Sequence, residues 1–168
     1  SYPDQCTQLE NLLEDAVRLR LIADVPLGAF LSGGIDSSVI VALAKRHTPN
    51  LNTFSIGFQD EGYFDETPYA NLVAKHFNTN HTVFKLKNDD LLNSLQSLLD
   101  YSDEPFADSS ALLVNILSKE TRKHVTVALS GDGGDELFAG YNKHYGEFKM
   151  REGKWDAKVL SSLLPLCK

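Results

Sequence analysis

Apolar residues along this chain form two kinds of pattern, short continuous runs and stripes in which they recur every three or four residues. The runs are typical of strands buried on both faces, and the stripes are typical of helices that pack one face on a sheet. The runs predict strands near residues 25–30, 51–58, 81–86 and 125–129. The stripes fall between them, so helix and strand alternate along the chain.

The first stripe predicts a helix from about Gln5 to Ala23; it comprises Leu9, Leu12, Leu13, Ala16 and Val17. A second helix is expected over 36–45. Asp65 is a good N-cap for a third helix, whose expected inner face holds Tyr69, Ala70, Leu72, Val73 and Phe77. Leucines at 91–99 and apolar residues at 112–117 predict two more helices, and the pattern after Tyr141 is weakly helical.

This alternation predicts an α/β fold, in which a parallel sheet carries helices on both faces. In such folds ligands bind beyond the carboxyl ends of the strands. Polar residues that follow a predicted strand are therefore the first candidates for function.

Composition narrows the class of protein. The chain has 168 residues, enough for one domain with a core, and its net charge of −7 argues against nucleic acid as a partner. No apolar run approaches the ~20 residues of a membrane span. Cys6 and Cys167 have no metal-binding spacing. We expect a cytoplasmic protein, and because the sequence shows no clear boundary at either end, a piece of a longer one.

The first candidate for chemistry is the stretch Ser32-Gly33-Gly34-Ile35-Asp36-Ser37-Ser38, which follows the first predicted strand and opens a helix. Two glycines at a helix start gather backbone N–H groups and the positive end of a helix dipole, an arrangement that binds phosphate. Asp36 would repel bare phosphate, so its presence favours a divalent cation bound with the phosphates. The pattern Ser-Gly-Gly-x-Asp-Ser has five fixed positions, and a match to all five arises by chance on the order of once per million starting positions.

A second glycine-rich turn, Ser130-Gly131-Asp132-Gly133-Gly134-Asp135-Glu136, follows the fourth predicted strand. Both turns come at carboxyl ends of strands, so a parallel sheet would bring them to one edge. The sequence therefore predicts one cleft formed by both.

Residues 24–38 and 128–141, in this order, resemble the C-terminal synthetase domain of glutamine-hydrolysing asparagine synthetases, which are N-type ATP pyrophosphatases. The resemblance implies an adenine-nucleotide α-hydrolase-like fold and an AMP-forming ligase that uses ATP and Mg²⁺. Its expected reaction amidates a carboxylate, that of aspartate in the family, through an acyl-adenylate. Ammonia would come from glutamine, hydrolysed by a glutaminase domain of the same full-length chain.

On this basis we expect residues 1–168 to be a single synthetase domain that lacks the glutaminase domain and its own C-terminal end, and that is inactive alone. A homodimer is left open, and neither nucleic acid nor a membrane is expected as a partner. The resemblance also assigns roles by position. It places ATP on Leu31, Ser32, Gly33, Gly34, Asp36, Ser37, Ser38, Ile56, Ser130 and Gly131, Mg²⁺ on Asp36 and Asp135, and adenylate formation on Asp132, where relatives often carry glutamate.

Several alternatives stay open at this point. Asp132 and Asp135 could simply cap the following helix. The loop Asp103–Ser110 differs from the substrate loop expected in asparagine-forming enzymes, so the amidated carboxylate is not fixed. A β-lactam synthetase, a tRNA-modifying enzyme of the same ATPase class and a nucleotide-binding module without turnover are the competing functions.

Overall fold

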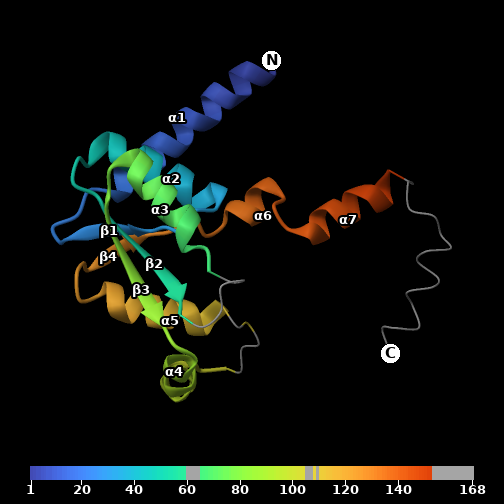
Figure 1. Ribbon diagram of the computed structural model, residues 1–168. Coiled ribbons are helices and arrows are strands. Elements are labelled where there is room, and N and C mark those ends of the chain that lie inside the picture. Colours follow the sequence, from blue (N-terminus) through green and yellow to red (C-terminus); the bar gives the residue numbers. More distant parts are fainter. Residues whose placement is uncertain (60–64, 105–107, 109, 153–168) are drawn as a thin grey trace. The chain divides into compact units, whose positions relative to one another are not determined.

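A computed structural model describes residues 1–59, 65–104, 108 and 110–152 of the chain (Figure 1). The chain divides into two compact units, Ser1–Gly131 and Asp132–Lys168. Part of the loop Asp103–Ser110 lies outside the described residues.

The first unit is built on a parallel sheet with the strand order β3-β2-β1-β4. Its strands are β1 (Leu27–Phe30), β2 (Asn52–Phe58), β3 (Asn80–Leu86) and β4 (Val127–Leu129). In the register, Phe30 lies opposite Phe54, and Ala29 lies opposite both Thr53 and Leu129. Because all neighbouring strands run parallel, their carboxyl ends meet at one edge.

Helices cover both faces of this sheet, as predicted. Figure 1 shows α1 (Tyr2–Arg20), α2 (Ile35–His47) and α3 (Thr67–Phe77) on one face, and α5 (Ser110–Thr121) with α4 (Asn88–Tyr101) on the other. The second unit holds α6 (Gly134–Phe138) and α7 (Asn142–Arg151). Across the described ranges, no helix combines the length and the apolar character that crossing a membrane requires.

The core of the first unit lies between the sheet and the helices α1, α2 and α3. Leu31 is 1% exposed and Val41 is fully buried, and each such side chain contributes about 1.5–3 kcal/mol to folding. Alanines at positions 70 and 74 bring α3 close to the strands. Arg46 of α2 also forms ion pairs with Glu10 and Glu14 of α1 at 2.8 and 2.7 Å, but because these pairs are partly exposed they add little to the apolar packing of the two helices.

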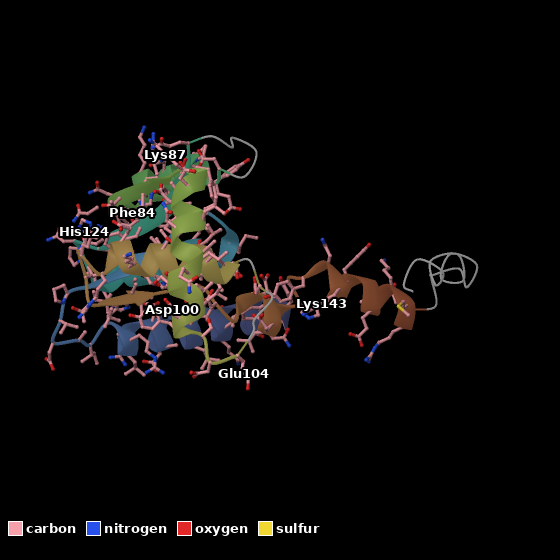
Figure 2. All side chains as sticks on the ribbon, turned by 90° about the horizontal axis from the view of Figure 1, so that it is seen from below. Phe84, Lys87, Asp100, Glu104, His124 and Lys143 are labelled. Carbon is pink, nitrogen blue, oxygen red and sulfur yellow. The ribbon has the colours of Figure 1, made fainter. Side chains whose placement is uncertain are left out.

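Aromatic rings fill the opposite face. The Phe54 ring stacks on Phe84 at 6.0 Å between centroids, and His124, just after α5, lies 5.6 Å from Phe54. Figure 2 shows Phe84 and His124 on this side of the molecule, with α4 running across it. These contacts hold α5 on β2 and β3.

Three sequence predictions are wrong in detail. The first helix begins at Tyr2 because Ser1 and Asp4 form a capping box, and it ends at Arg20. The expected inner face of α3 is only partly buried, since Tyr69 and Leu72 are 66% and 70% exposed. The strand β4 is not buried, because it pairs only with β1 at the sheet's edge and leaves Val127 39% exposed.

A buried polar cluster links β2 and β3 beneath α3. Thr53 Oγ1 lies 2.8 Å from Thr79 Oγ1 and 2.9 Å from His81 Nδ1, and Ser55 Oγ lies 3.2 Å from His81 Nε2. Desolvation by burial lowers the pKa of His81, although its contact with Thr53 acts in the opposite direction. The folded protein therefore favours the neutral imidazole.

We expect the free energy of unfolding to fall as the pH drops below 6.5, the ordinary pKa of this side chain. Between the lowered folded pKa and that value, the unfolded chain binds more protons, so stability is complete above this window and is lost as pH falls through it. Urea titrations at several pH values between 7.5 and 5 would measure the loss. In His81→Asn the same pH interval should change stability less; equal pH dependence in both proteins would contradict the prediction.

Candidate nucleotide site

The first glycine-rich loop is held by hydrogen bonds among its own serines. The Gly34 N–H donates to Ser32 Oγ at 3.2 Å, and Ser37 Oγ donates to the Gly34 carbonyl at 3.2 Å. The Ser32 and Ser37 hydroxyl oxygens lie 2.9 Å apart. Either hydroxyl can donate in this pair, and the Gly34 carbonyl also accepts the Ser38 hydroxyl at 2.6 Å. The loop is thus a closed ring of small polar groups at the carboxyl end of β1.

Backbone N–H groups at the start of α2 point out of this ring. Gly34 is the N-cap residue, and no side chain caps the helix. The first helical bond runs from the Ser38 N–H to the Gly34 carbonyl at 3.1 Å. The amides of Ile35, Asp36 and Ser37 therefore have no partner further back in the helix, which is the usual arrangement at an anion-binding helix start.

Gly33 packs directly against the backbone of α3. Its φ is +89°, and a Cβ placed on it would lie 2.6 Å from the Ala70 nitrogen and from Tyr69 Cβ. Ala70 itself is fully buried. Sequence reasoning missed this contact, and no signal in the sequence pairs these two segments.

The second turn meets the first at Gly131. A Cβ on Gly131 would lie 2.9 Å from the Ser37 nitrogen and 3.0 Å from Asp36 Cβ. Both positions belong to the first compact unit. The parallel sheet thus brings the ends of β1 and β4 together, so that these two glycine-containing turns touch.

The remaining predicted residues of the first unit differ in what they can offer a ligand. The Leu31 side chain lies in the core, and its N–H donates to the Phe54 carbonyl at 2.9 Å. Ile56 is half-buried near the end of β2, opposite Phe84. Ser130 follows the last residue of β4 and is also half-buried. Of Leu31, therefore, the backbone and not the side chain remains a candidate for contact with a nucleotide, whereas Ile56 and Ser130 remain candidates as whole residues.

The second unit contains Asp132 and Asp135. Gly133 has φ +92° and precedes the short helix α6, whose first turn includes Asp135. The Asp135 carboxylate lies against Gly140, and its carbonyl accepts the Gly140 N–H at 3.0 Å. Next to it, the Tyr141 hydroxyl donates to Glu136 Oε1 at 2.5 Å and lowers the pKa of that carboxyl group.

The side chains at the start of α2 fit a magnesium ion that is bound mainly through phosphate. Within the described ranges, no three His, Cys, Asp or Glu side chains gather closely enough to hold a metal alone. Mg²⁺ is commonly held by one or two carboxylates together with phosphate oxygens and water. Asp36 suits that arrangement: it is half-buried beside the anion-binding helix start, and within the described ranges its carboxylate forms no hydrogen bond or ion pair with another side chain.

A separate cavity of about 710 Å³ lies between α4, α5 and the edge strand β4. Its lining includes Tyr101, Lys119, Arg122 and Val127, and none of the residues predicted for ATP or Mg²⁺. The predicted nucleotide site lies instead at the carboxyl ends of the strands.

Comparisons with known proteins identify relatives of this chain. A family model described as asparagine synthase matches residues 8–164. A putative glutamine-hydrolysing asparagine synthetase 2 of Methanocaldococcus jannaschii is 44% identical over 164 residues, which is 95% of this chain and 32% of that protein. The glutamine-hydrolysing asparagine synthetase 1 of Bacillus subtilis is 42% identical over 135 residues, 80% of this chain and 21% of that one. The chain thus spans a third or less of these relatives.

Among solved structures, the NH3-dependent NAD synthetase of Campylobacter jejuni superposes with a TM-score of 0.54 at 16% identity. The match covers 81% of this chain and 60% of the synthetase. At this identity the structural similarity is evidence for the fold only. It confirms the predicted fold class, a parallel sheet with helices on both faces.

Proposed function

Because this chain belongs to the asparagine synthase family, we propose that it is the ATP-handling part of a ligase that converts the carboxylate of aspartate to an amide. One observation carries the proposal. The uncapped start of α2 and its ring of serines lie at the carboxyl end of β1, in contact with Gly131 after β4. The N–H groups at this helix start can bind a polyphosphate, and they lie at the edge where parallel sheets bind ligands.

In the proposed reaction, a carboxylate oxygen of aspartate attacks the α-phosphorus of ATP, the bond to the bridging oxygen breaks, and pyrophosphate leaves. Ammonia then attacks the acyl carbon of the adenylate, AMP leaves, and the excess proton passes to water. The α2 amides and the hydroxyls of Ser32, Ser37 and Ser38 would bind the charge of the departing pyrophosphate. Donors fixed before the reaction stabilise that charge without reorganisation.

We assign Mg²⁺ to Asp36 and Asp135, each acting together with phosphate oxygens. When bound, the ion supplies positive charge that partly neutralises the pyrophosphate. Ser130, Gly131 and the backbone of Leu31 are proposed contacts of the nucleotide, Ile56 a contact of its adenosine portion, and Asp132 the acid linked to adenylate formation. Ammonia would come from a glutaminase domain of a longer polypeptide, of which residues 1–168 would be part of the synthetase domain.

The reaction is tested on the full-length protein with ATP, Mg²⁺, aspartate and either glutamine or ammonium. Equal amounts of AMP, pyrophosphate and asparagine are expected. ADP as the product would contradict the proposed chemistry. AMP formed only with another acid, or with tRNA, would move the assignment to a related ligase, and ATP binding without any pyrophosphate would identify a binding module.

For Asp36→Asn we expect ATP to bind about tenfold more weakly in the presence of Mg²⁺, equal to ~1.4 kcal/mol. Without Mg²⁺ we expect ATP to bind no more weakly than to the parent protein, because the carboxylate that repels bare phosphate is gone. Unfolding free energy should stay within about 0.5 kcal/mol, because no described side chain pairs with this carboxylate. Calorimetric titration with and without Mg²⁺ measures both affinities. Asp24→Asn, which alters an exposed acid ahead of β1, is the control. Unchanged Mg²⁺ dependence in Asp36→Asn would refute the metal assignment.

A further inference from the structure

The first turn of α3 touches the ends of two neighbouring strands at once. At β1, Gly33 packs on the backbone of Tyr69 and Ala70 with no side chain in between, since a Cβ on Gly33 would lie 2.6 Å from both residues. At β2, a Cβ on Gly57 would lie 2.7 Å from Thr67 Cγ2. The loop proposed to bind phosphate therefore rests on a helix that is itself seated on the neighbouring strand.

Asp65 fixes this turn. Its Oδ1 accepts the Thr67 N–H at 3.1 Å, and its Oδ2 accepts the Thr67 hydroxyl at 2.9 Å. With the first bond, Asp65 satisfies the N–H of the first residue of α3, whose N-cap residue is Glu66 and not the predicted Asp65. The second holds the Thr67 hydroxyl toward Asp65, and the Thr67 methyl group then lies against Gly57. One carboxylate thus sets both the start of the helix and the rotamer of the side chain that seats it.

From these contacts we infer that Asp65 and Thr67 are positioning residues for the phosphate-binding loop, although neither belongs to it. Asp65 is bonded to Thr67, Thr67 in the first turn of α3 lies against Gly57, and Ala70 in the same turn lies against Gly33. Each contact lacks spare room, so a shift of the helix start is passed to Gly33 rather than absorbed. Only the role of the loop in binding ATP rests on the proposed function.

The contacts explain why two unrelated glycines are needed where they are. Any side chain at Gly57 would displace Thr67, and any side chain at Gly33 would displace Ala70. A loop whose donors must sit within a few tenths of an ångström of their working positions needs support of this kind from packed neighbours.

Asp65→Ala and Thr67→Val test the inference, since each removes the bond between the two side chains. Amide hydrogen exchange, followed by NMR, measures how often the backbone of the loop opens, and it needs no ligand. We expect the amides of Ser32 and Ser38 to exchange on the order of tenfold faster in both variants, while the amides of β2 change less. Mg²⁺-ATP affinity should fall in parallel. Thr67→Ser keeps the hydroxyl bond to Asp65 but loses the methyl group that lies against Gly57, so it should fall between the parent protein and Thr67→Val.

Asp90→Ala is the matched control. Asp90 Oδ2 accepts the Lys87 N–H at 2.8 Å at the start of α4, which packs on α5 rather than on the loop. The substitution Asp90→Ala therefore removes a helix cap without altering a contact of Gly33. Equal exchange at Ser32 and Ser38 in Asp65→Ala and Asp90→Ala would overturn the inference. A parent protein that binds no Mg²⁺-ATP would overturn the proposed function instead, and the exchange data would still decide the positioning role.

Discussion

Gly33→Ala should be the most damaging single-methyl change in the phosphate-binding loop. Two costs add: an L-residue at φ +89° is strained, and the new Cβ would lie 2.6 Å from the backbone of Tyr69 and Ala70. Helix backbone cannot move aside as the end of a long side chain can. We expect the unfolding free energy to fall by about 2–4 kcal/mol. Mg²⁺-ATP affinity should fall at least about tenfold, because the Ser32–Ser37 ring must shift.

The neighbouring glycine supplies the control. Gly34 has φ −67°, and a Cβ there would meet only Ser32 Oγ, at 3.4 Å. Gly34→Ala should therefore cost less than about 1 kcal/mol of stability. Chemical denaturation of both variants gives the comparison. Similar losses in the two variants would mean that the packing of Gly33 on α3 does not matter.

This contrast marks the limit of what the sequence could predict. Alternating apolar runs and stripes gave the order and type of the elements, because burial in a parallel sheet demands that pattern. The two glycines of the loop are indistinguishable in sequence. What separates them is a contact with Tyr69 and Ala70, which lie more than thirty residues away along the chain and come near only once the sheet has formed.

Burial was the weaker part of the prediction for a related reason. The leucine stripe of α4 is amphipathic, yet Leu92 and Leu99 remain 71% and 57% exposed, because α4 packs chiefly on one neighbour, α5. The run at 125–129 is apolar, yet its strand is an edge strand. Periodicity shows which face of an element is apolar. It does not show how many partners the element finds.

The second glycine-rich turn leads to the other large expected effect. In Gly131→Ala the backbone is not strained, but the new methyl group would lie 2.9 Å from the Ser37 nitrogen. That N–H is one of the three at the start of α2 that we assign to phosphate. The substitution therefore places carbon where the donor must face a ligand and also pushes the end of β4 away from Asp36.

The expected result is a loss of both stability and binding. We predict a loss of about 1–3 kcal/mol in unfolding free energy, because the nearest atoms belong to the backbone of α2 and cannot move aside as the end of a side chain can. Mg²⁺-ATP affinity should fall at least about tenfold, because an amide donor is displaced in a site that acts through fixed donors. Gly146→Ala, where a Cβ would meet nothing within 4 Å, should leave affinity unchanged. If Gly131→Ala bound Mg²⁺-ATP as tightly as the parent, phosphate would have to bind away from the junction of the two turns, and the assignment of the α2 amides would fail.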